Sequence, residues 1–238
     1  NKEKDMLEHN ERKNLVIETG IGEYERYAIK THFVQVGEDF GAIIEKYVMP
    51  HYKSGDIVSV SEKIVALCQN RIIHRKDMKI SFWAKFLSKF ASHPDHGIGV
   101  GEAIKMQFAI DQVGLLKVLW AAFASAVTKL LGKRGVFYEI VGMEVSGLDG
   151  FYDHVWEEYR DIGILIPANS SGVCDEMKAK IGIDMMIVDA NDYGQELLGK
   201  GTDLNIEDKH LLEMIKDNPA GQGRECTPII LIRKKEQE

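Results

Sequence analysis

The sequence predicts an α+β fold, in which mixed sheets pack against helices. Short apolar runs rich in β-branched residues alternate with longer runs in which apolar residues recur at helical spacing. The two kinds of run do not follow the regular strand–helix–strand order of a doubly wound sheet. The chain has 238 residues, of which 45% are hydrophobic and 28% charged, as is usual for a globular protein.

The predicted strands are short runs of Val, Ile, Thr, Tyr and Phe next to residues that favour turns. They are residues 27–36, 57–60, 136–141, 163–167, 184–188 and 228–233. The run that begins at Ile64 fits a helix or a strand equally well, because it is too short for its periodicity to decide.

The predicted helices show apolar residues three or four positions apart, several of them after a residue that can cap a helix. They are residues 39–47, 81–91, 102–113, 115–131, 170–181 and 208–216, with Ser170 or Ser171 as the cap of the fifth. The third and fourth fit one continuous helix as well as two. Large apolar residues such as Trp83, Trp120 and Phe123 predict that the second and fourth helices are buried in a core.

Composition and charge narrow the expected partners and location. The net charge of −7 shows no basic excess of the kind that nucleic-acid binders carry, so we expect no nucleic acid. The longest apolar run, within residues 113–131, is too short to span a bilayer, so we expect no membrane partner. Three scattered cysteines, Cys68, Cys174 and Cys226, argue against disulfides and zinc and are typical of the cytoplasm. Residues 1–20 are expected to form a polar arm before a domain of residues 21–238.

Polar groups follow apolar runs, next to glycine, in three separate segments. These segments are Ser61-Glu62-Lys63, residues 144–149 and residues 189–192, and a glycine-containing loop at 218–228 precedes the last predicted strand. Carboxylate and amide oxygens suit Mg²⁺ or Mn²⁺, and glycines let the backbone approach phosphate oxygens. No G-x-x-x-x-G-K-[ST] or G-x-G-x-x-G motif is present, so a nucleotide site here would be built without a P-loop.

Each of these features also has a purely structural interpretation. Asp, Asn and Gly at strand ends often serve turns alone, and Asp149 fits a turn as well as a metal role. Glu62 and Lys63 fit an exposed ion pair, and Gln222 fits a bond to loop backbone. His93 and His96 have no third metal ligand nearby in sequence and favour a flexible loop.

Four segments, in chain order, resemble coenzyme F420-0:L-glutamate ligases, the γ-glutamyl ligase family. They are GDIVSVSEKIVALCQNR (55–71), RGVFYEIVGMEVSG (134–147), MMIVDANDYG (185–194) and AGQGRECTPIILIR (220–233). The resemblance implies two intertwined subdomains, a homodimer, and a GTP- and Mg²⁺- or Mn²⁺-dependent reaction. In that reaction an amino acid, glutamate in the family, is joined to a carboxylate acceptor such as coenzyme F420-0.

The resemblance also assigns roles to individual residues. It implies metal ligation by Glu144 and Asp189, and by Gln222 in a loop that binds both metal and nucleotide. Asn191 and Asp192 are further metal candidates, although the chain has an extra residue there. The implied nucleotide-binding residues are Glu62, Lys63, Gly221, Gln222, Gly223 and Arg224.

The chain departs from the family pattern in two places. Glu144 stands where the family has Asp, and Gly147 stands where it has Asn. An Arg-Pro-Trp-Arg run that often follows the second metal Asp is replaced by Gln195-Glu196-Leu197 after Gly194. A basic cluster for an anionic acceptor is therefore missing. This leaves a ligase with another acceptor, a non-catalytic metal- or nucleotide-binding protein, and a structural protein with acidic turns as alternatives.

Overall fold

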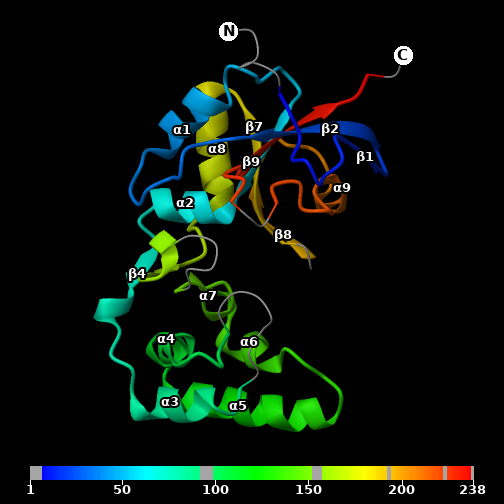
Figure 1. Cartoon of the computed structure of the whole chain (residues 1–238). Helices are drawn as coiled ribbons and strands as arrows, with labels where there is room; N and C mark the ends of the chain where they lie inside the picture. Colours follow the sequence, from blue (N-terminus) through cyan, green and yellow to red (C-terminus); the bar gives the residue numbers. More distant parts are fainter. Residues whose placement is uncertain (1–6, 92–98, 152–156, 192–193, 222–223, 237–238) are drawn as a thin grey trace. The chain divides into compact units, whose positions relative to one another are not determined.

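The computed structural model describes residues 7–91, 99–151, 157–191, 194–221 and 224–236, and it confirms the predicted α+β class (Figure 1). The chain divides into two compact units. Unit 1 contains residues 1–70 and 167–238, and unit 2 contains residues 71–166. Unit 2 is therefore inserted into the sequence of unit 1.

A six-stranded mixed sheet forms the centre of unit 1, with strand order β1-β2-β9-β3-β7-β8. The strands are β1 (Val16–Thr19), β2 (Gly22–Ile29), β3 (Ile57–Ser61), β7 (Asp184–Asn191), β8 (Gly194–Lys200) and β9 (Ile229–Lys234). Only β3 and β7 pair in parallel; the other neighbouring strands are antiparallel. β1 lies within the segment expected as a polar arm, and β8 follows β7 directly.

Helices cover both faces of this sheet. They are α1 (Phe40–Tyr47), α2 (Glu62–Cys68), α8 (Ser170–Ile181) and α9 (Asp208–Met214). One core joins Val58, Val60 and Ile187 to α1, α2 and α8, and the opposite core joins Val188 to α9. Figure 1 shows α1, α2 and α8 together on one side of the strands and α9 on the other. The alternation of side chains along β3 and β7 therefore feeds two separate cores.

Local signals explain where the unit 1 helices begin. Asp39 caps α1 by accepting a hydrogen bond from the Ala42 N–H at 2.9 Å. The cap of α8 is Asn169, which accepts from Gly172, and not Ser170 or Ser171 as predicted. Asn169 tolerates the left-handed conformation that this position adopts, with φ +49°.

Unit 2 combines a three-stranded antiparallel sheet with five α-helices among its described residues. The sheet has the order β4-β6-β5, from β4 (Ile72–His74), β6 (Ile162–Ile164) and β5 (Asp149–Gly150). The α-helices are α3 (Phe82–Ser88), α4 (Ala103–Val113), α5 (Leu115–Leu130), α6 (Val136–Val141) and α7 (Met143–Ser146), and two 3₁₀ turns span Arg75–Asp77 and Glu157–Tyr159. These elements share a core of their own.

The prediction of a strand at residues 136–141 was wrong, because this segment forms helix α6. Gly135 and Gly142 flank it with φ of +86° and +96°, conformations that only glycine adopts without strain. Between them Val136, Phe137 and Val141 are buried, and Phe137 and Val141 join the unit 2 core, in which α6 packs with α5. A six-residue run of β-branched and aromatic residues does not distinguish a strand from a short buried helix.

Two further expectations were also wrong. The strand predicted at residues 27–36 ends at Ile29, its last residue paired with β9, and the chain beyond it is irregular. The large apolar residues predicted to bury α3 and α5, among them Trp83, Trp120 and Phe123, are exposed. Small residues, Ala84 and Ala121, face the core in their place.

No single helix in the described segments is long and apolar enough to cross a membrane. The pair α4 and α5 together has suitable length and composition, but it is bent by 120°. The break falls at Gly114, whose φ of +83° ends α4 and begins α5.

Candidate functional site

The parallel pair β3 and β7 brings two of the predicted acids to the same edge of the unit 1 sheet. Ser61 is aligned with Val188 across the ladder, and the next residues along each chain are Glu62 and Asp189. Glu62 begins α2 and is buried, whereas Asp189 is partly exposed. Side chains alternate along a strand, so Asp189 belongs to the same face as Ile187, the face that α2 covers.

The glycine loop, residues 218–228, reaches this edge from the neighbouring strand. β9 begins opposite Val60, and the Ser61 N–H donates to the Pro228 carbonyl at 2.8 Å. The carboxyl end of β3 therefore adjoins the end of the glycine loop, and the carboxyl end of β7 lies on the other side of β3. The carboxyl ends of β3 and β7 lie side by side because the two strands pair in parallel.

A carboxylate that sequence reasoning passed over lies directly opposite Asp189. β7 and β8 pair with Asp189 aligned with Glu196, and Glu196 is exposed. Directly opposed residues on an antiparallel pair have Cβ atoms about 4.5–5.5 Å apart, and like charges there are destabilising. A bound cation would remove that repulsion. Recognising β8 as the hairpin partner of β7 would have revealed Glu196.

The glycine loop is anchored at both ends by hydrogen bonds. At its start, Asn218 adopts φ +51° and its side chain donates to the Gly221 carbonyl at 3.3 Å. At its end, the Thr227 hydroxyl donates to the Ala220 carbonyl at 2.9 Å and accepts from Asn10 at the same distance. Gly221 has φ +77°, and a Cβ there would lie 3.0 Å from the Glu225 carboxyl carbon. The loop therefore folds tightly on itself, which requires glycine at position 221.

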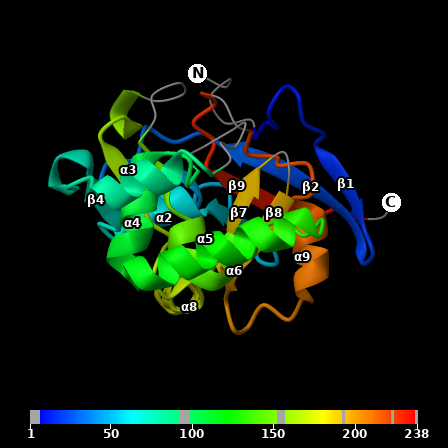
Figure 2. The same cartoon turned by 90° about the horizontal axis from the view of Figure 1, so that it is seen from below.

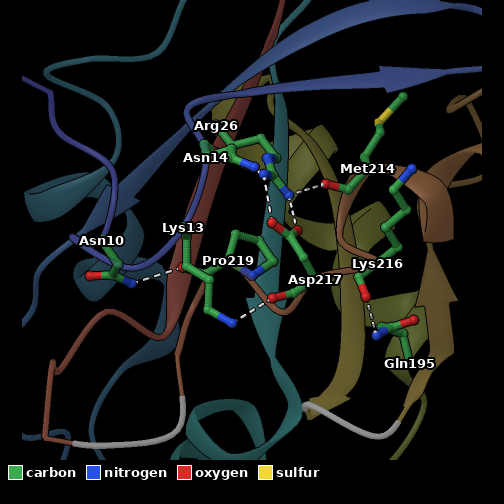
Figure 3. A network of polar contacts seen from close by, with 9 residues as sticks. All are labelled: Asn10, Lys13, Asn14, Arg26, Gln195, Met214, Lys216, Asp217 and Pro219. Carbon is green, nitrogen blue, oxygen red and sulfur yellow. Dashed lines mark hydrogen bonds and ion pairs between the residues drawn. The ribbon is translucent and has the colours of Figure 1, made fainter.

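The residues just before the loop are held from several directions (Figure 3). Asp217 accepts hydrogen bonds from both terminal nitrogens of Arg26, a side chain with no exposed surface. Arg26 also donates to the carbonyls of Met214 and Asn14, at 3.2 and 2.6 Å. Lys13 donates to the Asp217 carbonyl at 2.6 Å.

Arg26 also determines the charge state of Asp217. Burial of the Asp217 carboxyl acts to raise its pKa, but the hydrogen bonds and positive charge of Arg26 outweigh burial, so the pKa is lowered. Asp217 is therefore ionised at neutral pH and neutralises a buried guanidinium. The base of the glycine loop depends on this pair.

Glu144, predicted as a metal ligand, is bound by an arginine in unit 2. Both of its carboxylate oxygens accept from Nη2 of Arg71, at 2.9 and 3.0 Å. Arg71 is positioned in turn by a bond from its Nε to the Ile166 carbonyl at 2.8 Å. Glu144 lies on helix α7, whereas Asp189 lies within strand β7, and the two residues belong to different units.

The remaining predicted residues are placed as follows. Lys63 is partly exposed in the first turn of α2, and Arg224 is exposed on the glycine loop. Asn191 is the last residue of β7. Gln222, Gly223 and Asp192 lie outside the described residues, as do His93 and His96. Within the described part of the chain, no group of three or more His, Cys, Asp or Glu side chains is close enough to hold a metal alone.

The model of one protein family matches residues 28–214, which is most of the chain, and its description is F420-0:Gamma-glutamyl ligase. The chain belongs to this family. No curated protein matches the chain. The F420-0:gamma-glutamyl ligase match includes Glu62, Lys63, Glu144 and Asp189 and ends before the glycine loop. Membership supports an enzyme of the gamma-glutamyl ligase kind.

Proposed function

We propose that the protein is a GTP- and divalent-metal-dependent amide ligase that joins an amino acid to a carboxylate acceptor. An oxygen of the acceptor carboxylate attacks the γ-phosphorus of GTP, the bond to the β–γ bridging oxygen breaks, and GDP leaves. The amino group of the amino acid then attacks the acyl carbon of the acyl phosphate. Phosphate leaves, the nitrogen gives up a proton to solvent, and an amide remains.

The observation that carries this proposal is the convergence of Glu62, Asp189 and the glycine loop at one edge of the unit 1 sheet. Phosphoryl transfer needs positioned positive charge and backbone N–H donors more than it needs a protein nucleophile. Lys63 and the backbone of the glycine loop supply groups of both kinds. Membership of the gamma-glutamyl ligase family gives the reaction class.

The acidic groups at this edge fit a hard cation. Asp189 and Glu196 provide carboxylate oxygens from paired strands, which are ligands that Mg²⁺ and Mn²⁺ prefer. Mg²⁺ commonly uses one or two carboxylates and completes its shell with water and substrate phosphates, so a two-carboxylate set suffices. Such an ion, when bound, neutralises charge on the transferred phosphoryl group.

Other residues have distinct roles in the proposal. Glu62, buried at the start of α2, orients the turn that carries Lys63, and Lys63 faces the phosphates. Gly221 and Arg224 belong to the loop that binds the nucleotide, held in place by the Arg26–Asp217 pair. The family resemblance further implies Asn191, Asp192 and Gln222 as metal ligands and Gln222 and Gly223 as nucleotide-binding residues.

We propose that the carboxylate acceptor differs from that of family members that carry the Arg-Pro-Trp-Arg run. Gln195 and Glu196, which replace that run, form the first part of β8, and Glu196 adds negative charge beside Asp189. An anionic acceptor would be repelled there unless the cation is bound. This feature also favours the second candidate function, a metal- and nucleotide-binding protein without ligase activity.

The deciding experiment is a thermal-shift measurement with GTP, GDP and ATP, each with and without Mg²⁺ or Mn²⁺. A ligand at 100 times its dissociation constant stabilises the folded state by about 2.7 kcal/mol, which is readily measured. We expect stabilisation that needs nucleotide and metal together, and its loss in Asp189→Asn. Glu196→Gln should weaken this stabilisation, because Glu196 lies opposite Asp189 on the paired strand.

Asp184→Asn is the matched control, because it removes a carboxylate from the opposite end of the same strand, where Asp184 pairs with Lys178 at 2.9 Å. Its nucleotide- and metal-dependent shift should equal that of the wild type. Absence of any shift in the wild type would reject the proposal. A shift without release of phosphate from GTP in the presence of carboxylates and glutamate would support the non-catalytic alternative.

A further inference from the structure

Two helices of unit 2 point their largest apolar side chains into solvent. On α3 and just after it, the exposed residues are Phe82, Trp83, Phe86 and Phe90. On α5 and just after it, they are Leu116, Trp120, Phe123, Val127, Leu130 and Leu131. We call these ten residues the aromatic face. Exposed fractions reach 75% at Phe90 and 88% at Leu130, values unusual for side chains of this size in water.

The aromatic face is a regular feature of both helices. The α5 residues recur at intervals of three and four, which places them along one side of the helix. The opposite side supplies Val118 and Ala121 to the core, and α3 supplies Ala84. Neighbouring rings on each helix touch, with Phe86 and Phe90 centroids 5.1 Å apart and Trp120 and Phe123 5.9 Å apart. The smaller residues therefore pack α3 and α5 against the core of unit 2, while the large ones form an apolar surface.

Both helices lie at the same end of unit 2, as Figure 1 shows, with α4 above α3 and α6 above α5; Figure 2 views the molecule from that end. Gly114 makes this arrangement possible. Its positive φ bends the chain by 120°, so that α4 enters the core while α5 remains at the surface.

The charges on these helices identify the kind of partner. Residues 82–90 and 115–134 contain no acidic residue, although the chain as a whole carries a net charge of −7. They contain six cationic residues: Lys85, Lys89, Lys117, Lys129, Lys133 and Arg134. All six are exposed, and Lys133 is paired with Glu139. Helices that carry exposed apolar residues and cations, and no acidic residue, complement a surface with an apolar interior and an anionic outer layer.

We propose that the aromatic face binds the surface of a bilayer that contains anionic phospholipids. Amphipathic helices with Trp, Phe and Leu on one side and Lys at the margins lie in the interface between headgroups and acyl chains. Long lysine side chains extend along the apolar surface and place their ammonium groups among the headgroups. A second copy of this chain is a poorer occupant, because an isologous contact would bring lysines against lysines. The proposal revises the expectation of no membrane partner, which considered only segments that span a bilayer.

Flotation of the full-length chain with vesicles tests the proposal. We expect binding to phosphatidylcholine vesicles that contain phosphatidylglycerol, weak binding to phosphatidylcholine alone, and loss of binding at 1 M salt, where charges are screened beyond about 3 Å. Each lysine near an anionic surface contributes about fivefold in affinity, so Lys89→Gln with Lys117→Gln should weaken binding roughly 25-fold.

The apolar contribution is tested by Trp120→Ser with Phe123→Ser, which should abolish flotation. Both side chains are mostly exposed, so the thermal midpoint should not fall. Val36→Ser with Met49→Ser is the matched control, because it removes two exposed apolar residues from unit 1 and should leave binding unchanged.

Three results would overturn the proposal. The first is no flotation of the wild type with anionic vesicles, and the second is equal flotation of the wild type and of Trp120→Ser with Phe123→Ser. The third, seen by light scattering, is a wild-type dimer that does not float and becomes a monomer in that variant. It would assign the aromatic face to a second copy of the chain.

Discussion

Asp217 binds both terminal nitrogens of Arg26 at the point where helix α9 has ended and the glycine loop begins. The guanidinium is buried within unit 1, and Asp217 is the carboxylate that neutralises it. Arg26 comes from β2 and Asp217 from 191 residues further along the chain. Their contact ties the candidate nucleotide loop to the sheet.

Asp217→Ala is expected to lower the free energy of unfolding by about 3 kcal/mol, because it leaves a buried charge without its partner. The change should appear as a lower denaturation midpoint in urea with an unchanged slope. It should also weaken nucleotide binding, since the loop loses its anchor. Glu176→Ala breaks the exposed Glu176–Lys180 pair and is the control, with an expected loss of stability much smaller than that of Asp217→Ala. Equal effects of the two substitutions would contradict the structural role of Asp217.

Lys105 gives a prediction of pH dependence. It is buried in unit 2 and donates to the carbonyls of Ser146 and Leu148, both at 2.9 Å. Burial lowers the pKa of Lys105 from 10.5 to about 8, against the opposing effect of the Asp149 charge. Between these two pH values the unfolded chain binds a proton that the folded chain does not. The contribution of Lys105 to folding should therefore become more favourable as pH rises from about 8 to about 10.

Comparison of the wild type with Lys105→Met isolates this effect, because other titrations cancel in the difference. Urea unfolding at pH 7, 8, 9 and 10 should show the wild type gaining stability relative to the variant above pH 8. A difference that stays constant with pH would show that Lys105 keeps an ordinary pKa in the folded protein.

The pairing of Glu144 with Arg71 gives a prediction about the metal. Because both Glu144 oxygens already accept from Arg71, we expect Glu144→Gln to leave the metal-dependent nucleotide shift intact. The exposed pair contributes under about 1 kcal/mol, so Glu144→Gln and Arg71→Gln should have similarly small effects on stability. Loss of the shift in Glu144→Gln, with tighter metal binding in Arg71→Gln, would establish the metal role that the family resemblance implies.

Local sequence signals were sufficient for much of unit 1. Asp39 and the spacing of apolar residues after it predicted α1, and the apolar runs before Glu62 and Asp189 predicted β3 and β7. These predictions held because capping and side-chain alternation depend on residues a few positions apart. The strand predicted at residues 184–188 continues to Asn191, so Asp189 lies within β7 and not after it.

Contacts between residues far apart in the sequence could not be predicted from such local signals. The helix at Val136–Val141 is selected by its packing with α5, since its composition is equally typical of a strand. Glu196 lies opposite Asp189 only because of the β7–β8 register, and β8 was not among the predicted strands.

The sequence by itself determined the α+β class, the family, the acids near the carboxyl ends of β3 and β7, and the glycine loop that precedes β9. The tertiary structure alone decided that Arg26 and Asp217 anchor this loop, that Arg71 binds Glu144, and that α3 and α5 expose their aromatic residues. The physical reason is that helical periodicity shows which residues share a side of a helix, but burial depends on what packs against that side. Ala84 and Ala121 face the core of unit 2, and Trp120 and Phe123 therefore face outward.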